Sequence, residues 1–187
     1  LLGSKVREDV PISWWSIDAS PENWAAEARS AVGNGYTSFK NKPRPWWDIV
    51  HQVKTIAEVV PADFKLDLDP NGSLRDAETA IPVLSKLSEC DNVAMFESPI
   101  PQDDIHGNQQ IRQAIDRPIA MHFGSPDYLT GIKSEVCDGY VIGGGKSAVI
   151  RQGLLSAEAK KPFWLQLVGN GLTTTWAAHL GTVLTHA

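Results

Sequence analysis

The chain has 187 residues, enough for one sizeable hydrophobic core, and its formal net charge of −5 argues against nucleic acid as the main partner. No apolar run reaches the roughly 20 residues that a membrane-spanning helix needs, so we expect no membrane partner. The two cysteines, Cys90 and Cys137, lack the CxxC spacing of a zinc or redox site. Two isolated cysteines indicate buried thiols in a reducing compartment, and we expect the cytoplasm.

Both ends of the chain indicate a piece of a larger protein. The sequence begins Leu1-Leu2-Gly3 without an initiator methionine, and it ends at Ala187 directly after an apolar helical pattern. We therefore expect residues 1–187 to form one domain that is incomplete in this sequence.

Short strands alternate with amphipathic helices along the whole chain. Ser20-Pro21-Glu22 is a strong helix start, because serine caps and proline suits the first turn, and Ser125-Pro126-Asp127 repeats it. Pro82 is expected to kink its helix. In chain order we predict a strand at 10–15, a helix at 20–32, a strand at 36–40, a helix at 46–60, a strand at 65–69, a helix at 74–87, a strand at 92–96, a helix at 105–115, a strand at 118–121, a helix after 125–127, a strand at 139–142, a helix at 149–159, a strand at 162–168 and a helix at 172–184.

About seven βα units imply parallel strands with right-handed crossovers, which fits either an open doubly wound sheet or an eight-stranded barrel. The units are short and evenly spaced, and polar residues follow nearly every strand, which favours the barrel. The predicted fold class is α/β, a (β/α)8 TIM-type barrel that lacks its last unit here. Because an unclosed barrel leaves two strand edges unpaired, we do not expect these residues alone to fold stably.

In a barrel the carboxyl ends of the strands face one common cup, so residues far apart in sequence meet there. Neighbouring strands lie about 4.8 Å apart, which lets side chains of the third, fourth and fifth strands share one ion. Two carboxylates with a third ligand suit Mg²⁺, although Asp69 could instead only cap its turn. The residues delivered to this cup are Lys40 and Lys42, Asp69 and Asn71, Glu97, His122, Asp138 or the Gly143 loop, and Gln166.

Two lysines beside a divalent cation repel it unless an anion lies between them, and a substrate carboxylate is such an anion. A lysine made neutral by the nearby cation could remove the proton alpha to that carboxylate. The metal would stabilise the resulting enediolate. The pattern therefore favours proton abstraction from a small-molecule carboxylate.

Three short motifs carry a resemblance to a known family. Lys40-x-Lys42, Asp69-Pro70-Asn71 and Glu97-Ser98-Pro99, in this order, resemble the mandelate racemase/muconate lactonizing enzyme branch of the enolase superfamily. The resemblance implies that Asp69 and Glu97 bind Mg²⁺ and that Lys42 is the acid/base, with Lys40 contacting the substrate carboxylate or tuning Lys42. It also implies an N-terminal capping domain and an eighth strand. Separately, we expect the full-length protein to be a homo-oligomer.

The sequence departs from the family pattern at two places. The third metal ligand is normally an acid after the fifth strand, where this chain has Met121-His122-Phe123-Gly124. We assign His122 as that ligand, which would widen tolerance to Mn²⁺ or Zn²⁺; the alternative is a histidine hydrogen-bonded at the barrel rim. Asp138 lies near the position of a catalytic acid, but Gln166 stands where the family has a histidine, and glutamine cannot transfer protons.

Several functions remain open at this point. With one base, dehydration of an acid sugar or another hydroxy acid is more attractive than a two-base racemase or epimerase. We expect Asn71, Gln166 and Arg44 to bind substrate. The alternatives are a Schiff-base aldolase that uses Lys40 or Lys42 and binds phosphate with its glycine loops, and a barrel that keeps a metal site without catalysis.

Overall fold

The structure is a computed structural model, and it describes residues 3–167 and 169–184. The chain divides into two compact units. The N-terminal unit comprises Ser13–Ala120, and the C-terminal unit comprises the residues from Met121 onward together with those before Ser13.

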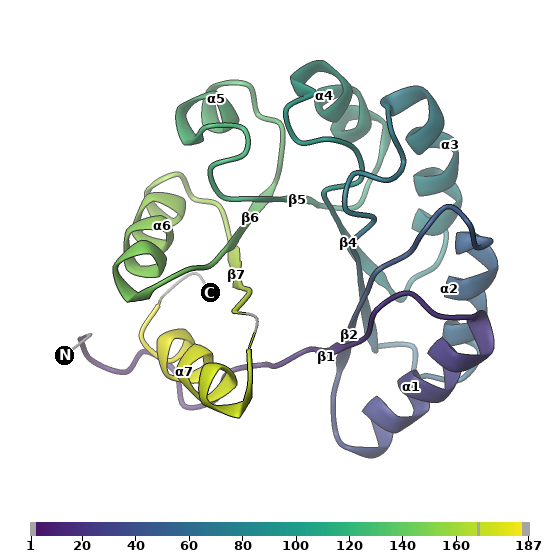
Figure 1. Cartoon of the computed structure of the whole chain (residues 1–187), viewed down its shortest axis with the longest axis horizontal. Helices are drawn as coiled ribbons and strands as arrows, with labels where there is room; N and C mark the ends of the chain where they lie inside the picture. Colours follow the sequence, from purple (N-terminus) through teal and green to yellow (C-terminus); the bar gives the residue numbers. More distant parts are fainter. Residues whose placement is uncertain (1–2, 168, 185–187) are drawn as a thin grey trace. The chain divides into compact units, whose positions relative to one another are not determined.

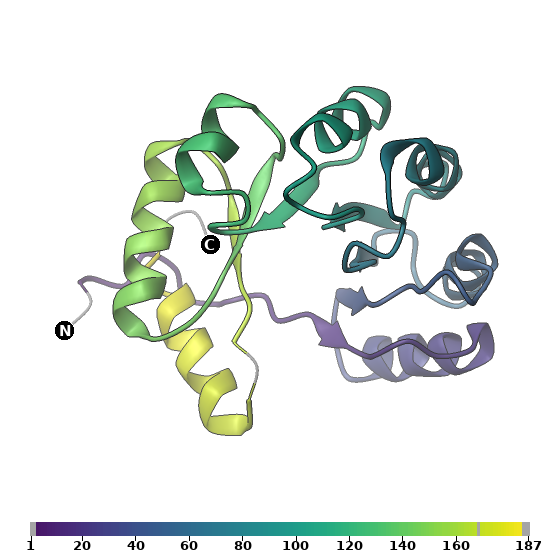
Figure 2. The same cartoon turned by 45° about the horizontal axis from the view of Figure 1, so that its top comes forward.

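The N-terminal unit is built from four consecutive βα pairs and the start of a fifth strand. Each strand pairs in parallel with the next one along the chain. Figure 1 shows the four helices on one side of the strands, and the turned view in Figure 2 shows the same arrangement. The elements are β1 (Trp14–Trp15), α1 (Pro21–Gly33), β2 (Ser38–Asn41), α2 (Ile49–Ala57), β3 (Lys65–Leu68), α3 (Ala77–Ser88), β4 (Val93–Glu97), α4 (Ile105–Ala114) and β5 (Ile119–His122), whose first half belongs to this unit.

The hydrophobic core of the N-terminal unit lies between its strands and helices. Alternate residues of the strands, among them Phe39 and Leu66, point toward the helices and are fully buried. Trp24, Ile56 and Leu84 meet them from α1, α2 and α3. Because this core takes one face of each strand, the opposite face is left for the polar residues that follow.

An irregularity between β3 and β4 sets which residues share that polar face. Leu66 pairs with Val93, but Asp67 pairs with Met95, so the register shifts by one residue on β4. A shift of one residue exchanges the two faces of a strand. Beyond it, Glu97 of β4 lies on the same face as Asp67.

The C-terminal unit repeats the same local pattern. β6 pairs in parallel with β7, and the Phe123 backbone N–H after β5 donates to the Val141 carbonyl of β6 at 2.9 Å. The Phe123 ring stacks on Tyr128 and meets Tyr140 edge-on. The elements are α5 (Tyr128–Lys133), β6 (Gly139–Ile142), α6 (Lys146–Glu158), β7 (Phe163–Leu165) and α7 (Gly171–Gly181).

The sequential order of the strands decides between the two predicted architectures. Within each unit every strand lies beside its neighbour in sequence, without the reversal of order that a doubly wound sheet requires. The predicted fold class, a (β/α)8 barrel type, is confirmed, with seven βα units among the described residues. None of the helices in this part of the chain is long and apolar enough to cross a membrane.

The element boundaries needed corrections. The predicted strand at 10–15 shortens to Trp14–Trp15, and the predicted helix at 46–60 begins only at Ile49, where Asp48 accepts from the His51 N–H. Ser125 does not cap the fifth helix; that role falls to Asp127, whose side chain accepts from the Thr130 N–H. Pro82 lies inside α3, and the kink expected there stays a prediction. Position 168, the end of the predicted strand at 162–168, lies outside the described residues.

Gly139 provides a test of the contact between β6 and β7. A Cβ at this position would lie 2.6 Å from the Trp164 ring and 2.9 Å from the Pro162 carbonyl. We expect Gly139→Ala to lower the free energy of unfolding by about 1–3 kcal/mol, because overpacking forces the backbone to move. Gly33→Ala, where a Cβ meets no atom within 4 Å, should be neutral or slightly stabilising in the same urea titration. Equal stability of the two variants would contradict the packing described.

Candidate active site

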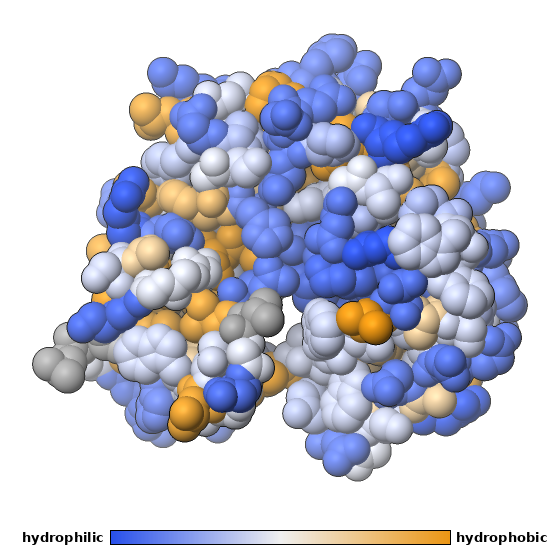
Figure 3. Space-filling model, viewed as in Figure 1, coloured by the Kyte–Doolittle hydropathy of each residue, from blue (hydrophilic) through white to orange (hydrophobic). Residues whose placement is uncertain are grey.

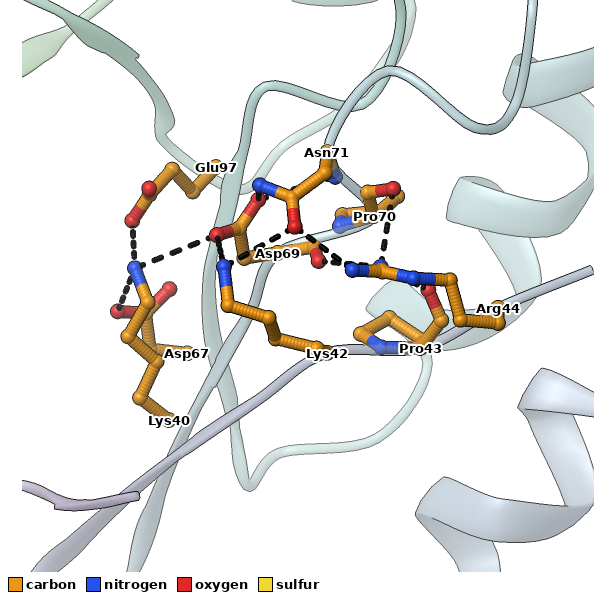
Figure 4. Close-up of polar contacts among 9 residues, drawn as sticks. All are labelled: Lys40, Lys42, Pro43, Arg44, Asp67, Asp69, Pro70, Asn71 and Glu97. Carbon is orange, nitrogen blue, oxygen red and sulfur yellow. Dashed lines mark hydrogen bonds and ion pairs between the residues drawn. The ribbon is translucent and has the colours of Figure 1, made fainter. Parts of the chain in front are cut away.

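The candidate site lies within the N-terminal unit, where β2, β3 and β4 end. Lys40 pairs with Asp67 across β2 and β3, so these two side chains stand next to each other. Lys42 and Asp69 follow on the same face one pleat further on, and Glu97 is the last residue of β4. Figure 4 shows the five side chains directed toward one another, and Figure 3 shows hydrophilic residues gathered over these strands.

Lys40 is the centre of the buried part of the cluster. Its ammonium group donates a hydrogen bond to Glu97 Oε2 and lies 3.6 Å from Asp69 Oδ2 and 3.7 Å from Asp67 Oδ2. The side chains of Asp69 and Glu97 are 0% and 1% exposed. Because both carboxylates contact one nitrogen, they are directed at one point and can share one cation.

Burial and charge act against each other on the ionisable groups of this cluster. Burial lowers the pKa of Lys40, but the carboxylates of Asp67, Glu97 and Asp69 outweigh it, so the pKa lies above its ordinary value. Burial raises the pKa of Asp67 to about 7; the charge of Lys40 lowers it, and the charges of Glu97 and Asp69 raise it further. The cluster therefore favours a protonated Lys40 and makes a third full negative charge costly.

Asp69 is also held by a second set of contacts, from Lys42 to its Oδ2 and from Asn71 to its Oδ1. Lys42 Nζ lies 2.6 Å from Asp69 Oδ2 and 3.0 Å from Asn71 Oδ1. Asp69 Oδ1 accepts from the Asn71 backbone N–H at 3.0 Å and from Asn71 Nδ2 at 2.8 Å. The Asp69 backbone N–H donates to the Asn41 carbonyl at 2.9 Å, which continues the β2–β3 ladder by one residue. Asp69 thus has a fixed backbone and a fixed carboxylate orientation.

The turn after β3 is tied to the loop after β4. Asn71 and Gly72 both adopt positive φ, 52° and 73°, and asparagine and glycine tolerate this conformation best. The Gly72 N–H donates to the Ser98 carbonyl at 2.7 Å. Ser98 also has a positive φ, of 47°, which is rare for serine and is strained. This hydrogen bond links the turn after Asp69 to the residue after Glu97, and so fixes the position of one carboxylate relative to the other.

Sequence reasoning left Asp67 and Ser98 out of the site. The alternation of β3 already placed Asp67 on the face of Asp69, which was the signal for including it. No local sequence pattern predicts the positive φ of Ser98.

The other expected site residues fall into two groups. Arg44 and Asn71, expected at the substrate, hydrogen-bond to each other at 2.7 Å beside Asp69. His122 ends β5 and Gln166 follows β7, and both belong to the C-terminal unit. Asp138 immediately precedes β6, so it lies at the amino end of that strand, whereas a barrel site uses the carboxyl ends. Among the described residues, no three His, Cys, Asp or Glu side chains are grouped closely enough to hold a metal ion.

A comparison with known protein families finds a match that includes these site residues. The family model described as "Enolase C-terminal domain-like" matches residues 23–187, which include the whole cluster. The chain belongs to this family. The resemblance read from the Lys-x-Lys, Asp-Pro-Asn and Glu-Ser-Pro motifs is confirmed at the level of the enolase superfamily.

Relatives within the enolase superfamily include enzymes of known activity. The chain is 30% identical over 142 residues to the N-succinyl-L-Arg/Lys racemase of Bacillus cereus, covering 74% of this chain and 38% of the racemase. It is 31% identical over 104 residues to the L-Ala-D/L-Glu epimerase of Bacillus subtilis, covering 54% and 28%. The chain thus spans less than half the length of the curated relatives that it matches.

A solved structure of the same superfamily matches nearly the whole chain. The crystal structure of the dipeptide epimerase from Cytophaga hutchinsonii, complexed with Mg and the dipeptide D-Ala-L-Val, has a TM-score of 0.82 and 25% identity. The match covers 99% of this chain and 52% of the epimerase. It is consistent with the fold class derived from the strand order.

Lys40 is the residue on which the cluster's stability depends. We expect Lys40→Met to lower the free energy of unfolding by about 3–5 kcal/mol, because it leaves buried carboxylates without their cation. The measurement is a urea titration with EDTA present, so that no metal replaces the lysine. Lys65→Met, at the exposed start of β3, should change the free energy by less than about 0.5 kcal/mol. A loss no larger for Lys40→Met than for this control would contradict the central role of Lys40.

Proposed function

We propose that the protein is a metal-dependent enzyme that removes the alpha proton of a small-molecule carboxylate. Lys42 acts as the base, Lys40 contacts the substrate carboxylate, and Asp69, Glu97 and His122 hold Mg²⁺. The observation that carries the proposal is the convergence of the buried Asp69 and Glu97 carboxylates on one cationic atom, Lys40 Nζ.

The donor set fits a hard divalent cation. Asp69 Oδ2 and Glu97 Oε2 are carboxylate oxygens, the ligands that Mg²⁺ prefers, and both already contact one positive charge. Asp69 Oδ1 is engaged by Asn71, which leaves Oδ2 as the oxygen that faces the cation. A bound cation would supply a positive charge that stabilises the negative charge developing on the substrate carboxylate. His122 completes the set in this proposal, and Mn²⁺ or Zn²⁺ are then acceptable.

The two lysines are placed for different roles. Lys42 follows the end of β2 and is the more exposed of the two, 18% against 11% for Lys40. Its amine lies beside Asp69 at the open side of the cluster, where the alpha carbon of a substrate can reach it. Lys40 lies deeper and keeps its charge among the three carboxylates, which suits an anchor for an anion.

The relatives support a more specific substrate class. The racemase and epimerases named above act on N-succinylated amino acids or dipeptides, which carry a carboxylate and an alpha proton. We propose that this protein is an isomerase for an N-acylated amino acid or dipeptide, and that dehydration of an acid sugar or hydroxy acid is the second candidate. Gln166 can bind such a substrate but cannot deliver a proton to it.

Loss of either carboxylate should remove metal binding. We expect Asp69→Asn and Glu97→Gln each to weaken Mg²⁺ binding by about 100-fold or more, measured by isothermal titration calorimetry. The matched control is Asp91→Asn, which removes a carboxylate that is 98% exposed in the same unit and should leave the affinity unchanged. Unchanged affinity in both site variants would refute the metal assignment.

Loss of Lys42 should stop proton abstraction. We expect Lys42→Ala to abolish exchange of the substrate alpha proton into D₂O, followed by NMR with N-succinyl amino acids and dipeptides as substrates, while Mg²⁺ binding persists. Lys54→Ala, on α2, serves as the control with normal exchange. Continued exchange in Lys42→Ala would identify another base. Borohydride trapping of Lys42 on a carbonyl substrate would favour the aldolase instead.

A further inference from the structure

Arg44 makes a concentrated set of hydrogen bonds to the turn that carries Asp69. Its Nη1 donates to the carbonyls of Pro43 at 2.9 Å, Asp69 at 3.1 Å and Pro70 at 3.1 Å. Its Nη2 donates to Asn71 Oδ1 at 2.7 Å. Figure 4 shows the guanidinium group crossing from the segment after β2 to the turn after β3. A planar group with several fixed donors can span such a set, whereas a lysine ammonium cannot.

The hydrogen bond from Arg44 to Asn71 determines how the side-chain amide of Asn71 is oriented. Arg44 and Lys42 are donors only, so both require the Asn71 oxygen to face them. The Asn71 nitrogen must then face the opposite way, where it donates to Asp69 Oδ1, an atom that only accepts. The donors and acceptors therefore allow one amide orientation, which leaves Asp69 Oδ2 directed at the lysines.

We propose that Arg44 is a positioning residue that orients the Asp69 carboxylate through Asn71 and the backbone of residues 69–70. The consequence for metal affinity rests on the function proposed above. The sequence suggested a substrate-binding role for Arg44, but its observed bonds are to the protein's own carbonyl and amide oxygens. Its task is to hold the cation-facing oxygen of Asp69 in place.

Arg44 could affect Mg²⁺ affinity by positioning Asp69 or only through its positive charge. The two explanations predict changes of Mg²⁺ affinity in opposite directions when Arg44 is replaced by methionine. Arg44→Met removes a positive charge, which by charge alone should tighten Mg²⁺ binding. Positioning predicts that Arg44→Met weakens binding by about 10-fold. Arg44→Lys keeps the charge but loses the fork of donors, so positioning predicts a similar loss and charge alone predicts no change. Arg75→Met, an exposed arginine soon after the same turn, is the control with unchanged affinity.

The first measurement is isothermal titration calorimetry of Mg²⁺ binding to the full-length protein. The second is NMR of the Asn71 side-chain amide in metal-free protein labelled with ¹⁵N-asparagine. We expect both Arg44 variants to shift the Asn71 amide signals and increase its hydrogen exchange, while circular dichroism stays unchanged. Tighter or unaltered Mg²⁺ binding in both variants would overturn the proposal, and so would an unchanged Asn71 signal.

The NMR measurement also separates this proposal from the proposed function. If the unaltered protein binds no Mg²⁺, the metal assignment fails, and the Asn71 signal alone decides. A shift in both Arg44 variants and not in Arg75→Met then supports Arg44 as the residue that holds Asn71. The same signal in all four proteins refutes that role.

Discussion

The ammonium group of Lys40 is the constraint on which the rest of the site depends. Carboxylates as buried as Asp69 and Glu97 are costly without a partner, and Lys40 contacts both of them and Asp67. Lysine reaches this point only because β2 and β3 are parallel neighbours with Lys40 opposite Asp67. The pairing of the strands and the charge balance of the cluster therefore stabilise each other, and a change in one disturbs the other.

The register shift between β3 and β4 places carboxylates of both strands on one face of the sheet. Before the shift, Leu66 and Val93 both belong to the core under the helices. After it, Leu68 pairs with Phe96, and the next pair on the opposite face brings Asp69 beside Glu97. Without the shift Glu97 would lie one residue further along and on the other face. A single irregularity thus decides whether two carboxylates from different strands can share a cation.

Much of this arrangement could be predicted from the sequence, because strand alternation and strand ends are local properties. The repeated βα pattern gave the fold class, and the polar residues after each strand gave Lys40, Lys42, Asp69 and Glu97 as neighbours. The register shift at Leu66 and the bonds of Arg44 could not be predicted, since both depend on contacts between segments far apart in sequence. Helix starts were predicted less precisely than strands, and the helix predicted at 46–60 begins only after its cap, Asp48. Ser125 and Asp127 both fit the pattern of a helix-capping residue before α5, and in the structure Asp127 is the cap.

Charge balance links the buried cluster to the kind of substrate that suits it. The three carboxylates of Asp67, Asp69 and Glu97 contact two lysines, Lys40 and Lys42, which leaves a formal charge of −1. A divalent cation held by Asp69 and Glu97 would change this formal charge to +1. A substrate carboxylate would then return the sum to zero and give Lys40 a new partner. The same count explains why a neutral substrate suits this site poorly, because it would leave the cluster with one uncompensated positive charge.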